Sequence, residues 1–99
     1  MTLDAYPVRL THLWRWRNDR VILFSDATFN IRRFDLNLLA GTIWELSDGQ
    51  RTVGDIVGII ANAFPTQPVE PLQAGVMTFL DDLEKEWLVM GRDALDGDD

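Results

Sequence analysis

The spacing of apolar residues changes once along the chain, after Phe34, and this change restricts the fold more than any other feature of the sequence. Before Phe34, apolar and polar residues alternate over residues 8–17 and short apolar, β-branched runs follow, which is typical of strands. After Phe34, apolar residues recur every three or four positions, as on the buried side of a helix. We therefore expect an α+β domain in which a small sheet precedes a group of helices.

The first third of the chain predicts a three-stranded antiparallel meander. The alternating run over residues 8–17 ends at Asn18-Asp19, a pair typical of tight turns, and residues 21–24 predict a second strand. Residues 25–27 predict the next turn. Residues 28–34 are rich in β-branched and aromatic side chains, as expected for a third strand.

Two helices follow, each with a recognisable first residue. Asn37 is suited to cap the first helix, whose apolar stripe ends at the turn residues 47–49. Thr52 begins the second helix with Asp55 three residues further on, a start that resembles a capping box. Pro65 ends this helix.

The third helix is expected to be the longest. It follows the link over residues 65–68 and tolerates Pro71 in its first turn. Residues 88–90 predict a short closing strand after it. The apolar stripe of the third helix is expected to carry Val69, Leu72, Val76, Phe79, Leu80, Leu83 and Trp87.

Length and composition suit a single globular domain. The chain has 99 residues, of which 46% are hydrophobic and 25% charged, enough for one modest core. We expect the domain to cover residues 1–90, and the acidic, apolar-poor residues 91–99 to form a disordered tail. No apolar run could span a bilayer and residues 1–10 lack the features of a signal peptide, so we expect a soluble, cytoplasmic protein.

The formal net charge of −7 is unevenly distributed. From residue 51 onward three basic residues oppose ten acidic ones, so this half carries the whole excess. Binding to nucleic acid or to anionic lipid relies on clustered cations, so we expect neither as a partner. A peptide partner is compatible with this charge.

The sequence offers little for catalysis. Without cysteine there is no thiolate nucleophile and no cysteine-ligated metal, and the single histidine, His12, is expected to pack on the apolar face of the first strand. The acidic residues of the third helix predict a solvated face, and the glycines form no phosphate-binding motif. We expect no enzymatic activity, no cofactor and no metal site.

Four tryptophans could instead suggest a platform on which bases of single-stranded nucleic acid stack. Trp14 and Trp16 lie on the apolar strand face and Trp87 on the stripe of the third helix, so we expect these three to pack in the core. For Trp44 both interpretations stay open.

Residues 36–57 carry a combination of motifs that points to one family. They read LNLLAGTIWELSDGQRTVGDIV and resemble the PqqD-like family, whose pattern combines LN, an alanine-rich turn, IWELCDG, a basic residue, TV and an acidic residue before IV. The resemblance continues to Val89 and covers most of residues 8–89. The sequence departs from the pattern at Ser47, which replaces a common cysteine, at Leu38-Leu39, and at Glu86-Trp87, where the family usually has a glycine.

The resemblance implies a winged-helix-like fold of three strands followed by three helices. It also implies a non-catalytic role, in which the protein holds the leader of a ribosomally made precursor peptide for a separate modifying enzyme. A radical SAM protein is the expected enzyme, and lasso-peptide proteases are served by other relatives.

The residues themselves suggest how a leader could bind. The third strand is expected to be a sheet edge to which an extended peptide adds as a further strand, and one flank of the third helix is expected to line the groove beside it. Asp81 could pair with a basic leader residue. Four of these residues also have a structural interpretation: Met77 and Leu80 could be core residues, while Arg32 and Arg33 could protect a free edge from aggregation. The expected peptide-binding residues are Thr28, Phe29, Asn30, Ile31, Arg32, Arg33, Gln73, Met77, Leu80, Asp81 and Glu84.

Two other functions remain open from the sequence. A winged-helix DNA-binding protein would use the third helix for recognition, but this helix carries five acidic residues against Lys85 alone. A structural or adaptor subunit could dock on a partner protein through the tryptophan-rich strand face. The protein could be a monomer or, through an exposed edge, a strand-swapped dimer.

Overall fold

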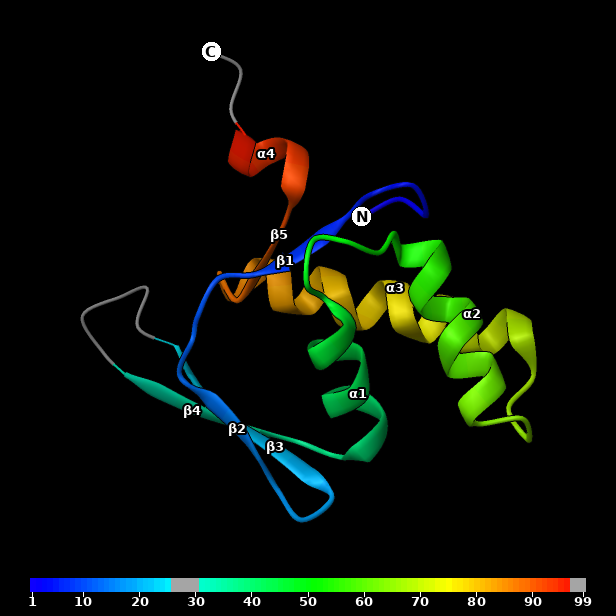
Figure 1. Ribbon diagram of the computed structural model, residues 1–99, viewed down its shortest axis with the longest axis horizontal. Coiled ribbons are helices and arrows are strands. Elements are labelled where there is room, and N and C mark those ends of the chain that lie inside the picture. Colours follow the sequence, from blue (N-terminus) through cyan, green and yellow to red (C-terminus); the bar gives the residue numbers. More distant parts are fainter. Residues whose placement is uncertain (26–30, 97–99) are drawn as a thin grey trace.

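The computed structural model of the protein describes residues 1–25 and 31–96, in which an antiparallel sheet is followed by helices (Figure 1). The predicted α+β fold class is confirmed. Helix α1 lies between the three-stranded sheet on one side and helices α2 and α3 on the other. The elements are β1 (Pro7–Arg9), β2 (Trp14–Arg17), β3 (Arg20–Ser25), β4 (Arg32–Leu36), α1 (Leu38–Leu46), α2 (Val53–Ala63), α3 (Val69–Lys85), β5 (Val89–Gly91) and α4 (Arg92–Asp96).

The main sheet has the order β2-β3-β4 with antiparallel pairing throughout. Asn18 has a φ of 59°, which lets two residues connect β2 to β3. The predicted second strand is present as β3, in which Val21 and Leu23 are fully buried, whereas Arg20 and Phe24 on the other face are exposed.

The first predicted strand is divided between two sheets. Residues 7–9 form β1, which pairs with β5, and only residues 14–17 join the main sheet as β2. Between them the Thr11 hydroxyl donates a hydrogen bond to the Phe24 carbonyl (3.0 Å) and accepts one from the Leu13 amide (3.1 Å). The prediction of one continuous strand was wrong. Apolar and polar residues alternate through both segments, so the pattern did not show that the first segment pairs with β5 and the second with β3.

The third strand also differs from its predicted range. It covers Arg32–Leu36, so it begins after Ile31 and continues two residues beyond Phe34. The predicted positions Thr28, Phe29 and Asn30 lie outside the described residues.

The helix starts follow from local capping. The Asn37 side chain accepts a hydrogen bond from the Ala40 amide (2.9 Å), and Thr52 and Asp55 form a reciprocal capping box, as predicted. At the other end of α1, the Arg9 guanidinium donates hydrogen bonds to the carbonyls of Trp44 (3.1 Å) and Glu45. This cation from β1 satisfies carbonyls that have no partner within the helix.

Trp44 lies at the centre of the core. It is fully buried and packs edge-on against Trp14, with ring centroids 6.1 Å apart, which settles its position among the packed tryptophans. Trp16, also predicted to pack, is half-buried against the core. Helix α1 approaches the sheet closely at Gly41, where a Cβ atom would lie only 2.7 Å from Cγ2 of Val21.

The stripe of α3 is shorter than predicted. Leu72, Val76, Leu80 and Leu83 are buried, but Val69 and Trp87 are each 57% exposed. The helix ends at Lys85, so Trp87 leaves the helical period and adopts a φ of 61°. The expectation that Trp87 packs in the core was therefore wrong.

The closing strand is confirmed as β5, and the short helix α4 follows it within the segment predicted as a tail. Arg92 holds this segment to the domain. Its guanidinium donates a hydrogen bond to the Gly49 carbonyl (2.8 Å) and stacks 4.0 Å from the centre of the Tyr6 ring. Composition predicted disorder here, but did not show that Arg92 had these partners.

Candidate functional site

Strand β4 is an edge of the main sheet, and among the described residues no strand pairs with its outer side. The Phe24 amide donates to the Leu13 carbonyl, so the backbone of Phe24 points toward β2. These directions alternate along a strand, so the main-chain groups of Leu23 point the other way, toward β4, and bond to its register partner Phe34. The main-chain N–H and C=O groups of Arg33 and Asp35, on either side of Phe34, therefore point away from β3, toward the unpaired side of β4. A row of available main-chain groups therefore lies along β4.

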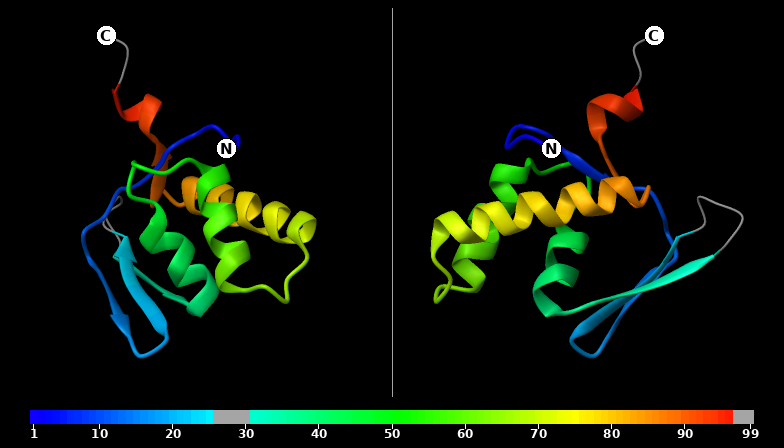
Figure 2. Two further views of the ribbon diagram at one scale, coloured as in Figure 1. Left: turned by 45° about the vertical axis from the view of Figure 1, so that its right-hand side comes forward. Right: turned by 180° about the vertical axis from the view of Figure 1, so that it is seen from behind.

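Helix α3 lies next to β4, on the face of the sheet that is turned toward α1. Glu86, which caps the C-terminus of α3, forms an ion pair with Arg32 at the start of β4. Phe79 and Gly75, two and three turns earlier, line a cavity together with Asn37, which directly follows β4. In the right-hand view of Figure 2, β4 and the C-terminal half of α3 lie on the same side of the molecule. The face of α3 turned toward β4 thus carries Gly75, Phe79 and Glu86.

The cavity between α1 and α3 has a volume of about 290 Å³. Sites for drug-sized ligands typically have roughly 300 to 1,000 Å³, so this cavity suits one or two apolar side chains better than a cofactor. It lies at the C-terminal end of the β4 edge. It is lined by Asn37, Leu39, Ala40, Ile43, Gln67, Pro71, Leu72, Gly75, Val76 and Phe79.

The α3 residues predicted to line a groove lie elsewhere. Leu80 is fully buried, as its alternative interpretation as a core residue requires. Met77 precedes Phe79 by two positions, which is about 200° around a helix, and Gln73 and Glu84 share the side of Met77. Asp81, expected to pair with a leader residue, instead forms an ion pair with the α-ammonium group of Met1. The period of α3 identified its buried stripe, whereas the predicted groove residues Gln73, Met77 and Glu84 lie on the flank opposite to Phe79.

The strand residues of the predicted site are partly brought together. Ile31 is 71% exposed just before β4. The Arg32 guanidinium also lies 4.9 Å from the centre of the Phe34 ring, while Arg33 on the opposite face bonds to Asp35 at 3.0 Å. Asp35, whose main chain faces outward, was missed because the third strand was expected to end at Phe34.

Other kinds of site find little support. Within residues 1–25 and 31–96 no group of three or more histidine, cysteine, aspartate or glutamate side chains is placed to hold a metal ion. His12 is exposed in the segment between β1 and β2, so the expectation that it packs on a strand face was wrong. No helix in the described part of the chain is long and apolar enough to cross a membrane.

Comparison with known families gives a match over most of the chain. Residues 22–89 match the sequence model of the family described as Coenzyme PQQ synthesis protein D (PqqD). The match covers more than half of the chain and includes β4, the helices α1 to α3 and most of β3. No curated protein and no solved structure matches the chain significantly.

Proposed function

Because the chain belongs to the PqqD family, we propose that it is a non-catalytic module that captures the leader of a ribosomally made precursor peptide and presents it to a separate modifying enzyme. A role as a peptide-binding accessory protein follows from the family. The mode of capture, the type of enzyme and the binding residues are the proposal.

The free edge of β4 is the observation that carries this proposal. An extended peptide lying along β4 can bond to the outward-facing main-chain groups of Arg33 and Asp35 and extend the sheet by one strand. Main-chain bonding of this kind supplies affinity without regard to the peptide's sequence. Side-chain contacts must therefore supply the selectivity.

We assign the selectivity to the cavity between α1 and α3. Alternate side chains of an added strand point toward the inner face of the sheet, where Phe79 and Gly75 of α3 lie. One bulky apolar side chain of the leader would fill the cavity next to Asn37. Met77 and Leu80 have no part in this site.

The enzyme is proposed to be a radical SAM protein, in line with the family resemblance. If it binds the module while the leader is held, the core peptide reaches a high local concentration at its active site, and a modest leader affinity suffices.

The alternatives have less support. A DNA-recognition role for α3 conflicts with its acidic surface, and Trp14 and Trp16 face α1, which leaves the adaptor hypothesis without its tryptophan surface.

Isothermal titration with the leader of any short peptide encoded beside this gene tests the proposal. Asp35→Pro removes one outward-facing N–H from an edge strand, where proline is tolerated, whereas Asp35→Ala keeps that donor and removes only the side chain. We expect micromolar or tighter binding to the unmodified protein, at least tenfold weaker binding to the proline variant, and little change for alanine. The proposal is wrong if the leader does not bind, or if a folded Asp35→Pro variant binds it normally.

A further inference from the structure

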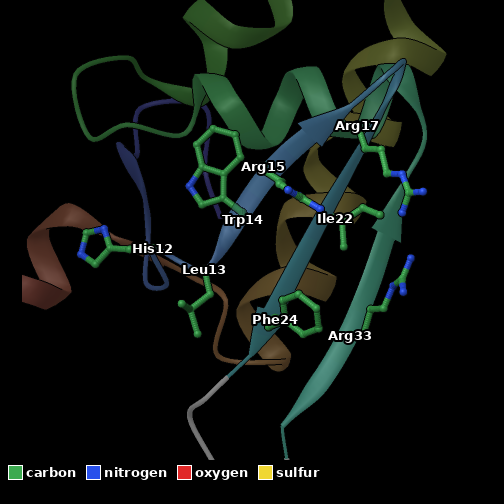
Figure 3. A pocket seen from close by; sticks show the side chains of 8 residues that line it. All are labelled: His12, Leu13, Trp14, Arg15, Arg17, Ile22, Phe24 and Arg33. Atoms are coloured by element: carbon green, nitrogen blue, oxygen red, sulfur yellow. The ribbon is translucent and has the colours of Figure 1, made fainter.

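The main sheet has a second face, turned away from α1, which we call the outer face. It is formed by Arg15 and Arg17 of β2, Arg20, Ile22 and Phe24 of β3, and Arg33 and Asp35 of β4. Figure 3 shows the side chains of Arg15, Arg17, Ile22, Phe24 and Arg33 on this side of the sheet, with helices α1 and α3 behind it. These five side chains line a hollow of about 390 Å³, together with His12, Leu13 and Trp14.

The charge of the outer face is opposite to that of the protein. Four arginines stand against two carboxylates: that of Asp35, which already bonds to Arg33 at 3.0 Å, and that of Asp19, in the turn between β2 and β3, which lines a smaller hollow with Arg17 and Arg20. The chain as a whole has a formal net charge of −7. A cationic surface on an acidic protein attracts an acidic partner to one place and repels it elsewhere.

The fold gives no reason for this gathering of arginines. Arg17 and Arg20 are direct register partners across the hairpin, and like charges in this position destabilise a sheet. Among the described residues neither they nor Arg15 take part in an ion pair. Three cations thus remain on a surface where stability alone disfavours them.

The middle of the outer face is apolar. Leu13 is 49% exposed and Phe24 37%, and the half-buried Ile22 lies between the arginines. An apolar centre inside a charged rim is the usual composition of a protein interface, and arginine and aromatic residues are enriched among the side chains that dominate binding energy. The hollow can accept a protruding apolar side chain.

We propose that the outer face is the docking surface for the modifying enzyme, and that the enzyme presents to it an acidic surface with a protruding apolar side chain. This inference rests on the proposed function. The outer face is turned away from α1, whereas α3 and the α1–α3 cavity lie on the opposite face of the sheet. Enzyme and leader therefore bind at the same time. Association with the enzyme weakens as ionic strength rises, because the complementary charges are exposed.

The test is surface plasmon resonance with any purified radical SAM protein whose gene lies beside the gene of this protein. Arg17→Glu reverses one charge of the outer face, and Lys85→Glu, on α3, changes the net charge of the protein by the same amount. We expect the dissociation constant for the enzyme to rise at least tenfold for Arg17→Glu and to stay within twofold for Lys85→Glu. The unfolding midpoint of Arg17→Glu should be at least as high as that of the original protein, which a structural role for Arg17 would not allow.

Titration of both variants with the leader separates this inference from the proposed function. Unchanged leader affinity for Arg17→Glu, together with lost enzyme binding, supports two separate sites. Normal enzyme binding by Arg17→Glu, equal weakening by both reversals, or loss of leader rather than enzyme binding would overturn the docking surface. Failure of the leader to bind the original protein would count against the proposed function instead.

Discussion

The ion pair between Arg32 and Glu86 joins the start of β4 to the C-terminal cap of α3. Both side chains are exposed to solvent, so their attraction is screened. The pair matters mainly because it identifies the face of α3 that is turned toward the sheet edge.

Removing this ion pair should therefore change stability little. We expect Glu86→Gln to lower the free energy of unfolding by less than about 1 kcal/mol, the usual range for an exposed pair. Urea denaturation followed by tryptophan fluorescence measures the difference. A loss well above that range would mean that the pair organises the junction of β4 and α3.

The two flanks of α3 can be compared directly by a pair of substitutions. Phe79→Ala removes a side chain from the wall of the α1–α3 cavity, whereas Met77→Ala removes a half-buried side chain from the other flank. We expect Phe79→Ala to weaken leader binding about tenfold, or roughly 1.4 kcal/mol, and Met77→Ala to leave it nearly unchanged. Titration calorimetry at a temperature where both variants are folded gives the comparison, and the reverse order of effects would restore the originally predicted flank.

Trp87 should be replaceable by glycine with a gain in stability. Its φ of 61° costs a side-chain-bearing residue about 1 kcal/mol or more, and its side chain is 57% exposed. We expect Trp87→Gly to raise the free energy of unfolding by about 1 kcal/mol, and Trp87→Ala, which keeps the Cβ atom, to give no such gain. If glycine instead destabilises the protein, the indole contributes packing that outweighs the backbone strain.

Two glycines in helices should respond to alanine in opposite directions. A Cβ at Gly41 would lie 2.7 Å from Val21, whereas a Cβ at Gly58 would meet no atom within 4 Å. We expect Gly41→Ala to destabilise by about 1–3 kcal/mol through overpacking, and Gly58→Ala to stabilise by up to about 1 kcal/mol through helix propensity. Thermal unfolding of both variants tests this, and a stable Gly41→Ala would show that α1 can move away from the sheet.

The sequence was informative wherever the determining contacts are local. Asn37 and Thr52 cap the helices they precede, and Asn18 turns the first hairpin, because each acts on residues within one turn of itself. The stripe of α3 was likewise found from its period. These features needed no knowledge of the neighbouring elements.

The errors arose where the answer depends on distant parts of the chain. Periodicity could not show that β1 would leave the main sheet to pair with β5, nor which flank of α3 would meet β4, because both depend on how the helices pack. Trp87 continued the helical period in sequence although the helix had ended at Lys85. For the candidate site, the edge strand was predictable, whereas the cavity beside it was not.

The pairing of β1 with β5 also has a consequence for the order in which the protein folds. It joins Pro7 to Gly91, more than eighty residues away, whereas β2, β3 and β4 pair only with their sequence neighbours. Closing so long a loop costs more conformational entropy than forming a hairpin, so the main sheet can assemble early and the terminal strands late. The strand edge proposed to bind the peptide is then among the first surfaces that the nascent domain acquires, before its two ends have met.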